Sequence, residues 1–203
     1  MNILLVHGFW NRGSVFKSME KRLLLAGHRC FAPTLHPRDG RLGIVDLAQK
    51  LSVYVSQNLP ENRPFAVVAF SMGCLVTQTF LHSLSETRRV KAFFAISGPM
   101  KGTLTAWLYP GKGARDMRPG SEFLRQVSSQ LRLPLPIPTY TYYTPLDLMI
   151  VPADSSRLSH ARELQVLSLI HRAMLHNNRV TGDIISRIAE VEGPESRSML
   201  KAE

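Results

Sequence analysis

The segment 67–76, VVAFSMGCLV, places a serine where a nucleophile could be activated. Small and β-branched residues predict a buried strand that ends at Phe70, and the residues after the turn predict a helix, so that Ser71 lies in the sharp turn between them. Such a turn leaves little space two positions to either side of the serine. Gly73 meets this requirement, and Ala69 exceeds it by one methyl group. A serine in a turn is otherwise ordinary, so the hypothesis depends on a base and an acid elsewhere.

The acid that orients a catalytic base is expected between the serine and the histidine along the chain. Asp147 follows a predicted strand in TPLDLMIVP, where its neighbours are apolar, which is unusual for a solvated turn residue. Asp154 is the main alternative, but its setting, ADSS, is more typical of a helix cap. We therefore expect Asp147 to be the acid.

The base is expected on the loop that follows the last strand. His171 occupies that place in LSLIHRAML, 24 residues after Asp147. A lone histidine is more often a packing or surface residue than a base, so position is the argument here. His176 and His160 are alternatives: the first belongs to the entry of the final helix, and the second precedes the last strand, at the opposite end of the sheet.

Backbone N–H groups that could stabilise a developing oxyanion follow two of the predicted strands. His7, Gly8 and Phe9 come directly after the first strand, and Met72 begins the helix after Ser71. The amides of Phe9 and Met72 are therefore expected to act together. An isolated His-Gly pair usually marks a simple turn. This one supports the hypothesis only because Ser71, Asp147 and His171 also occupy the expected positions.

Short apolar runs alternate with segments of helical periodicity along most of the chain. This alternation predicts a three-layer α/β/α fold, in which about six mostly parallel strands carry helices on both faces. Ligands of such sheets bind outside the carboxyl ends of the strands. The predicted strands are 2–6, 30–33, 65–70, 91–96, 139–143 and 164–167, and the predicted helices begin near Ser14 and cover 44–55, 72–84 and 180–188.

Residues 1–192 are expected to form a single domain. Within it, the proline-rich segment 98–138 is long for a plain connection, so we expect either a functional loop or a partial cap, with a short helix over 121–131. The polar tail 193–203 is expected to be disordered.

The composition is that of an ordinary globular domain with a basic balance. The chain has 203 residues, 44% of them hydrophobic, and a formal charge of 25 − 15 = +10. A basic protein favours anionic partners, but scattered charges are typical of a solvated basic surface, which we expect, with a weak contact to an anionic membrane surface as the alternative. The lysines and arginines are scattered and no nucleic-acid motif is present, so no nucleic-acid partner is expected. No feature indicates an oligomeric state.

The two cysteines, Cys30 and Cys74, have neither the spacing of metal ligands nor the number needed for a disulfide framework. Cys74 is expected to be a buried, reduced thiol at the start of a helix. No apolar run resembles a signal peptide or approaches the length of a membrane span, which predicts a cytoplasmic location.

Taken together, these motifs resemble those of the α/β-hydrolases, in particular the small bacterial lipase-like esterases, over most of residues 1–190. Three residues depart from the pattern of that family: Ala69 replaces the first glycine of its serine turn, Phe70 stands where it often has histidine, and Cys74 where it often has glycine. The segments that carry the resemblance are 6–9, 69–73, 97–103, 116–121, 147–152 and 171–175.

The resemblance implies a serine hydrolase of carboxylic esters, acting on a small-molecule or lipid ester. Ser71, Asp147 and His171 match the family's catalytic triad, and the amides of Phe9 and Met72 match its oxyanion hole. Neither a metal ion nor an organic cofactor is expected.

The substrate pocket is expected at four side chains near these motifs, namely His7, Phe70, Trp107 and Tyr109. The same triad could serve a thioesterase, an amidase or an acyltransferase. A hydrolase fold retained as a non-catalytic binding module is the alternative from a different class.

Overall fold

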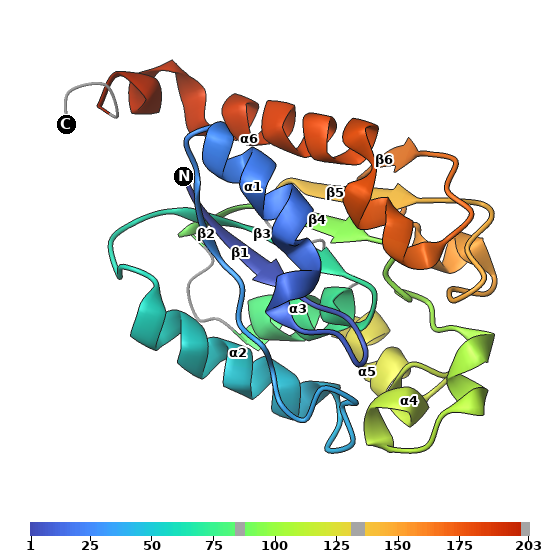
Figure 1. Cartoon of the computed structure of the whole chain (residues 1–203). Coiled ribbons are helices and arrows are strands. Elements are labelled where there is room, and N and C mark those ends of the chain that lie inside the picture. Colours follow the sequence, from blue (N-terminus) through green and yellow to red (C-terminus); the bar gives the residue numbers. More distant parts are fainter. Residues whose placement is uncertain (84–87, 131–136, 200–203) are drawn as a thin grey trace.

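The computed structural model describes residues 1–83, 88–130 and 137–199. Its centre is one sheet of six strands in the order β2-β1-β3-β4-β5-β6, and every neighbouring pair is parallel (Figure 1). The predicted parallel α/β sheet is therefore confirmed. The strands are β1 (Asn2–Val6), β2 (Arg29–Phe31), β3 (Phe65–Phe70), β4 (Val90–Ile96), β5 (Thr139–Tyr143) and β6 (Arg162–Gln165).

Helices cover both faces of the sheet, as the alternation of segments predicts. The longer helices are α1 (Lys17–Leu25), α2 (Ile44–Asn58), α3 (Met72–Ser83), α5 (Glu122–Gln130) and α6 (Asn178–Met199). Helices α1 and α6 lie on one face, and α2 and α3 lie on the other (Figure 1). Shorter turns are α4 (Lys112–Asp116) and the 3-10 segments η1 (Gly13–Phe16), η2 (Leu104–Leu108), η3 (Ala153–Ser156) and η4 (His171–His176).

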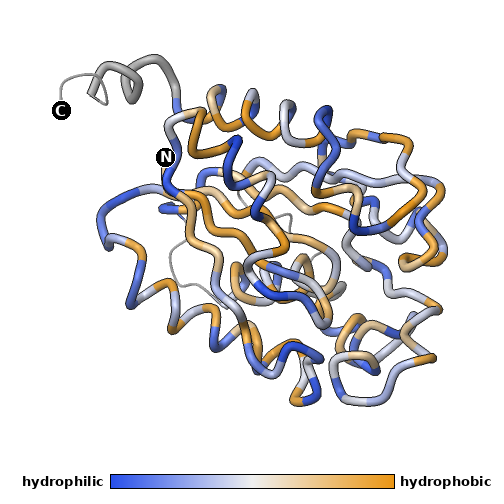
Figure 2. Tube along the Cα trace, in the orientation of Figure 1, coloured by the Kyte–Doolittle hydropathy of each residue, from blue (hydrophilic) through white to orange (hydrophobic). Residues whose placement is uncertain are grey.

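The two faces of the sheet build two separate hydrophobic cores. In β1, Ile3 and Leu5 pack toward α1 and α6, whereas Leu4 and Val6 pack toward α2 and α3. All four are fully buried. A strand buried on both faces reads as a continuous apolar run, which is why the central strands are hydrophobic along their length in Figure 2 and were visible in the sequence.

The strand register brings the carboxyl ends of the central strands together. Val6 pairs with Ala69, Phe70 pairs with Ile96, and Ile96 pairs in turn with Tyr142. The segments that follow β1, β3, β4 and β5 therefore meet along one edge of the sheet, where all the predicted catalytic residues were expected.

The first helix and the last strand are displaced from their predicted positions. The first helix was expected to begin near Ser14, but Ser14 lies inside η1 and α1 begins at Lys17, with no side-chain cap for either. The last strand covers Arg162–Gln165 instead of 164–167. It is an edge strand whose residues are mostly exposed, so its sequence is polar. The prediction was shifted toward the C-terminus because the apolar Val166 and Leu167 directly follow the strand.

The predicted short helix after β4 is confirmed as α5. The hydroxyl of Ser121 accepts a hydrogen bond from the amide of Leu124 at 3.1 Å, which caps this helix. Before it lie η2 and α4, so the proline-rich segment contains several short elements. Its residues 131–136 lie outside the described part of the chain, as does residue 84 of the predicted third helix.

Helix α6 continues to Met199, so residues 193–199 of the expected tail lie within it. Residues 200–203 are outside the described part of the chain. Among the residues that the structure describes, no helix combines the length and the apolar character that crossing a membrane would require.

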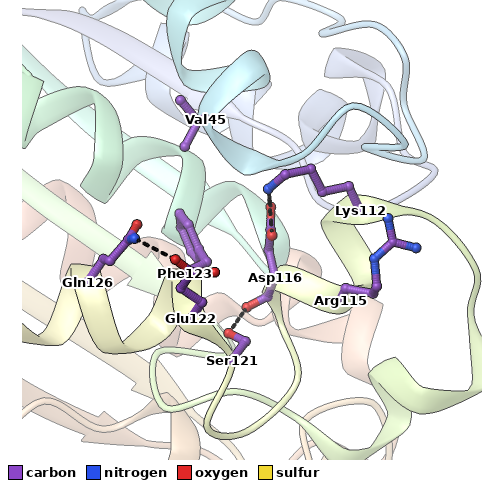
Figure 3. Close-up of a pocket in the computed structure, with 8 residues that line it drawn as sticks. All are labelled: Val45, Lys112, Arg115, Asp116, Ser121, Glu122, Phe123 and Gln126. Carbon is purple, nitrogen blue, oxygen red and sulfur yellow. Dashed lines mark hydrogen bonds and ion pairs between the residues drawn. The ribbon is translucent and has the colours of Figure 1, made fainter.

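A cavity of about 440 Å³ lies between α2, α4 and α5 and is separate from the predicted site residues (Figure 3). Its wall contains Asp116, whose Oδ2 accepts a hydrogen bond from the amide of Ile44 at 2.9 Å, while its Oδ1 pairs with Lys112 at 2.9 Å. A buried carboxylate at this place caps the first turn of α2 and ties α4 to it. We therefore assign Asp116 a structural role.

Candidate active site

Ser71 stands in a strained turn between β3 and α3. Its φ is +57°, in the left-handed region that non-glycine residues adopt at a cost of about 1–3 kcal/mol. Its amide donates a hydrogen bond to the carbonyl of Ile96 at 2.9 Å, which continues the ladder of β4 into the turn. Because the next residue begins α3, Ser71 also lies at the positive end of a twelve-residue helix.

The turn is tight on the side of Gly73 and tolerant on the side of Ala69. A Cβ atom at position 73 would lie 2.6 Å from the carbonyl oxygen of His7, so only glycine fits there. Ala69 is fully buried within β3 and pairs with Val6 and Ala95 in an undistorted register. The sheet therefore accommodates the methyl group that replaces the family's first glycine.

The other two departures from the family pattern also have a place in this turn. Cys74 is a buried, reduced thiol, as predicted, and its S–H donates to the carbonyl of Ala69 at 3.4 Å. The side chain of Cys74 also requires glycine at position 98, because a Cβ atom there would lie 2.6 Å from the Cβ of Cys74. Phe70 is buried and packs against His171 with the two rings tilted by 34° and their centroids 4.7 Å apart.

The turn after β1 touches Ser71 directly. A Cβ atom at Gly8 would lie 3.3 Å from the hydroxyl oxygen of Ser71 and 2.7 Å from its Cβ. Glycine at position 8 therefore lets the backbone of this turn approach the serine hydroxyl. The predicted oxyanion turn and the predicted nucleophile are neighbours in space.

The buried side chain of His7 holds the backbone of this turn through hydrogen bonds. It is 1% exposed, its Nε2 accepts a hydrogen bond from the amide of Leu35 at 2.9 Å, and its Nδ1 lies 2.8 Å from the carbonyl of Gly8. An Nε2 that accepts requires the proton on Nδ1, so the ring is neutral and donates to Gly8. Burial lowers the pKa of His7, which favours the same neutral form. His7 was expected at the substrate pocket, but both of its nitrogens are engaged in holding the backbone.

The hydrogen bonds of the turn leave the amide of Phe9 unused. The amide of Trp10 donates to the carbonyl of Arg38 at 2.8 Å, and that of Asn11 donates to Gly8 at 3.1 Å. The amide of Phe9 donates to no residue in the described part of the chain, whereas its carbonyl accepts from the side chain of Asn11 at 2.7 Å. Because Met72 opens α3, its amide has no partner within the helix either.

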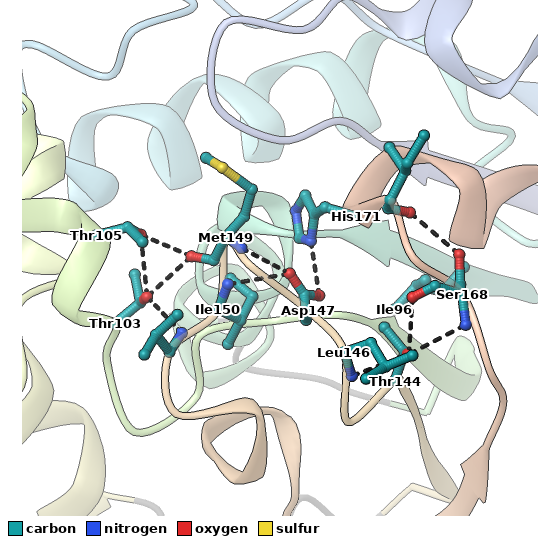
Figure 4. Close-up of polar contacts among 12 residues, drawn as sticks. Ile96, Thr103, Thr105, Thr144, Leu146, Asp147, Met149, Ile150, Ser168 and His171 are labelled. Atoms are coloured by element: carbon teal, nitrogen blue, oxygen red, sulfur yellow. Dashed lines mark hydrogen bonds and ion pairs between the residues drawn. The ribbon is translucent and has the colours of Figure 1, made fainter.

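Asp147 and His171 are brought together by the loops after β5 and β6 (Figure 4). Nδ1 of His171 lies 2.8 Å from Oδ2 of Asp147. The other carboxylate oxygen accepts the amides of Met149 at 2.9 Å and Ile150 at 3.0 Å. Three donors therefore fix the orientation of a carboxylate that is only 5% exposed.

The environment keeps Asp147 ionised. Burial acts to raise its pKa, but the hydrogen bond from His171 and the two backbone amides outweigh burial, so the pKa lies below its usual value. A depressed pKa means that this carboxylate stabilises the fold at neutral pH, and that its contribution is lost as the pH falls below about 4. Since an ionised carboxylate only accepts, a neutral His171 ring carries its proton on Nδ1, and its Nε2 then has a free lone pair.

The free nitrogen of His171 is directed into the protein. Nε2 is buried and has no hydrogen-bond partner among the described residues, and the hydroxyl of Ser71 is not bonded to it in this structure. The ring packs against Phe70, the residue next to Ser71. The ring that carries this unpartnered nitrogen thus contacts the residue that precedes the strained Ser71.

A threonine pair holds the loop that carries Asp147. The hydroxyl of Thr103 accepts from the amide of Val151 at 2.9 Å and donates to the carbonyl of Met149 at 2.9 Å (Figure 4). Thr105 donates to the same carbonyl at 2.6 Å. Because the amide of Met149 binds Asp147, these threonines of the segment after β4 fix the acid through its backbone neighbours.

A third threonine joins the acid loop to the histidine loop. Thr144, at the end of β5, accepts from the amide of Ser168 at 3.1 Å and donates to its carbonyl at 3.0 Å. Ser168 in turn donates from its side chain to the carbonyl of Ile170, the residue before His171. Sequence reasoning missed these threonines, because each acts across a long separation in the chain.

The alternative residues lie elsewhere. Asp154 is exposed and forms ion pairs with Lys101 and Arg157, and no side chain caps η3, so the expected cap at Asp154 was wrong. His160 lies before β6, at the opposite end of the sheet, and His176 ends η4 on the surface.

Aromatic side chains border the turn after β1. The ring of Tyr109 lies 5.4 Å from those of Phe9 and Trp10, and Phe9 stacks on Trp10 at 5.0 Å. Trp107 is exposed instead, with the guanidinium of Arg118 4.2 Å above its ring. Trp10 was missed from the sequence, although it directly follows the predicted oxyanion turn. In the described part of the chain, no three histidine, cysteine, aspartate or glutamate side chains are grouped to hold a metal ion.

Comparison with known proteins places this arrangement in a family. The chain is similar to lipase B of Aspergillus fumigatus, with 20% identity and a TM-score of 0.76 over 91% of this chain and 51% of that chain. It is also similar to lipase BlEst2 of Bacillus licheniformis, with 16% identity and a TM-score of 0.73 over 92% of this chain and 91% of that one. Phospholipase PlaB of Legionella pneumophila shares 13% identity and a TM-score of 0.59 over 69% of this chain and 38% of that one.

These likenesses concern the fold, and this chain spans about half the length of the Aspergillus lipase. A search of curated protein sequences gives no match. The model of the alpha/beta hydrolase family, in contrast, matches residues 3–182, which is most of the chain. The chain belongs to the alpha/beta hydrolase family.

Proposed function

We propose that this protein is a serine hydrolase that cleaves carboxylic esters through an acyl-enzyme, with Ser71, His171 and Asp147 as its triad. One observation carries the proposal. His171 is held by an ionised, buried Asp147 at 2.8 Å, its unpartnered Nε2 is buried, and its ring packs against Phe70, the residue before a serine in a left-handed turn. Strain and an unpartnered buried base are both features that folds retain at functional sites.

The chemistry follows from these groups. As the hydroxyl of Ser71 attacks the ester carbonyl, Nε2 of His171 takes its proton, and Asp147 stabilises the imidazolium that results. His171 then returns the proton to the leaving alcohol, which breaks the C–O bond and leaves the acyl group on Ser71. Water, deprotonated by the same nitrogen, attacks the acyl-enzyme and releases the acid.

The amides of Phe9 and Met72 would bind the oxyanion of both tetrahedral intermediates. The unused amide of Phe9 and the contact of Gly8 with Ser71 support this role. One such donor contributes about 3–4 kcal/mol to the transition state. The aromatic cluster of Phe9, Trp10 and Tyr109 lies beside the same turn, so we propose that it borders the substrate.

The leaving group is the feature that distinguishes the alternatives. Lipases and a phospholipase among the structural neighbours favour lipid or other carboxylic esters. A thioesterase, an amidase or an acyltransferase would use the same three side chains. A binding module would need none of them, yet all three are present with the histidine and the acid paired.

Turnover of matched substrates tests the reaction class. The wild-type protein is assayed with p-nitrophenyl esters of increasing acyl length, with the corresponding thioesters and with p-nitroanilides. The highest kcat/KM is expected for an ester, because a nitrophenolate leaves more readily than an anilide. A faster thioester or anilide would replace the proposal by the corresponding alternative, and no turnover by folded protein would favour a binding module.

Asp147→Asn is expected to lower kcat/KM for the best ester by about 10³–10⁴-fold. An asparagine amide can donate to Nδ1 of His171, which leaves the proton on Nε2, where the base should be free. The fold should be retained, since an asparagine side chain keeps the shape of the aspartate. The measurement is steady-state ester hydrolysis with a melting curve for each variant.

Asp154→Asn is the matched control for this prediction. It removes an exposed carboxylate, the alternative acid of the sequence, and should leave kcat/KM within about twofold of the wild type. Similar losses in the two variants would contradict the assignment of Asp147.

A further inference from the structure

Large exposed hydrophobic side chains gather on the edge of the sheet that holds the proposed triad. Most of those in the described part of the chain follow the carboxyl ends of β1, β4, β5 and β6. Figure 2 shows the hydrophobic segments among the loops beyond β5 and β6. We call this group the apolar rim: Trp10, Leu104, Trp107, Leu108, Leu146, Leu148, Met149, Leu167, Leu169 and Ile170.

The members of the rim surround the site on short, well-anchored segments. Leu148 and Met149 flank the amide that binds Asp147, and Ile170 precedes His171. Leu104 is tied by its amide to the carbonyl of Val151 at 2.8 Å, which joins η2 to the acid loop. Single exposed leucines are ordinary, but an exposed apolar group of this extent marks an interaction surface.

The types of side chain fit the boundary between water and lipid. Trp10 and Trp107 are exposed at 57% and 61%, and tryptophan prefers a position with one apolar and one wet side. Arg118 lies over the ring of Trp107 at 4.2 Å, so a cation accompanies this exposed aromatic.

Further cations lie on the same edge. Arg12 follows β1, Arg115 belongs to α4, and Arg172 comes directly after His171; all three are exposed. None of them forms an ion pair within the described part of the chain. The chain as a whole carries a formal charge of +10. An anionic surface would therefore be attracted to this edge.

We infer that the apolar rim docks on an anionic lipid surface, from which the proposed active site takes its ester; the inference rests on the proposed function. Leucine and tryptophan side chains of the rim enter the headgroup boundary, and the neighbouring arginines bind lipid phosphates. A second copy of the chain fits less well, because two strongly basic edges would face one another. A protein lid over the rim would close the edge at which the proposed nucleophile is presented.

Vesicle binding tests this inference with the full chain carrying Ser71→Ala, which prevents hydrolysis during the measurement. The protein is sedimented with vesicles of equal parts phosphatidylglycerol and phosphatidylcholine, and with vesicles of phosphatidylcholine alone. The protein should bind the anionic vesicles more tightly, and added salt should weaken that binding. The rim variant changes three leucines of three loops, exposed at 78%, 77% and 76%: Leu108→Gln, Leu148→Gln and Leu169→Gln.

A matched control removes three exposed apolar side chains from elsewhere on the surface. Leu24 and Leu25 lie in the last turn of α1, and Val53 lies on the outer side of α2, away from the rim. The rim variant should raise the Kd for anionic vesicles by at least about tenfold, whereas the control should stay within about twofold. The control variant is Leu24→Gln, Leu25→Gln and Val53→Gln.

Equal Kd values for the rim variant and the wild type would overturn the inference, as would concentration-dependent dimerisation that the rim variant abolishes. Hydrolysis of a water-soluble ester, measured with Ser71 restored, separates the two proposals. If that hydrolysis is unchanged by the rim variant while vesicle binding is lost, docking is supported. Hydrolysis without any vesicle binding refutes docking alone, and vesicle binding without hydrolysis refutes the proposed function alone.

Discussion

Ser71→Ala is expected to lower kcat/KM for p-nitrophenyl esters by at least about 10⁴-fold, because the acyl-enzyme cannot form without its hydroxyl. The amides of Phe9 and Met72 remain in this variant, so a small residual rate above that of buffer should persist. Alanine tolerates the left-handed φ of position 71 no worse than serine does. Steady-state hydrolysis and the Tm therefore separate a chemical loss from an unfolding.

Ser97 offers a closely matched control. It directly follows the neighbouring strand β4, is fully buried and has a φ of +47°. Its hydroxyl has no partner among the described residues. Ser97→Ala should keep kcat/KM within about threefold and leave the Tm unchanged, because no hydrogen bond is lost. If both alanine variants lost activity equally, the strained edge of the sheet would matter more than the hydroxyl of Ser71.

His171→Ala is expected to reduce kcat/KM by about 10⁴–10⁶-fold, the second large effect. Without Nε2 nothing takes the proton of Ser71, and the alanine leaves a gap beside Phe70 of the size of an imidazole ring. Imidazole added to the assay should enter this gap and restore part of the rate. Rescue that depends on the unprotonated form of imidazole would identify the missing group as a base.

The control for this variant is His176→Ala, which removes an exposed histidine from the same 3-10 segment. Its kcat/KM should remain within about twofold of the wild type, with no response to imidazole. A loss in His176→Ala comparable to that in His171→Ala would show that η4, and not its first residue, is what the reaction requires.

The residues of the proposed site could be predicted because their signals are local. A buried parallel strand followed by a tight turn and a helix requires an apolar run, a small residue on each side of the turn and a helical pattern after it. Residues 65–83 show all three. Asp147 and His171 could be placed because each follows a strand at the carboxyl edge. The structure adds the 2.8 Å contact between them, which no spacing along the chain determines.

The supporting contacts could not be predicted, because they join distant segments. Thr103 and Met149 are 46 residues apart, and Leu35 reaches His7 across 28 residues. Nothing in the local pattern of a threonine or a histidine indicates such a partner. The position of β6 escaped prediction for another reason: an edge strand is exposed, so Arg162–Gln165 needs no apolar pattern.

Covalent labelling tests the central claim, that Ser71 is an activated nucleophile, most directly. A fluorophosphonate reacts only with a serine whose proton is removed by a neighbouring base, and it requires no knowledge of the natural substrate. The product is read by intact mass and by peptide mapping of the labelled residue.

Wild-type protein should take up one label per chain, on Ser71, whereas Ser71→Ala should take up none and Ser97→Ala should be labelled fully. His171→Ala should label far more slowly than the wild type. Folded wild-type protein that takes up no label, or a label that maps to another residue, would contradict the account.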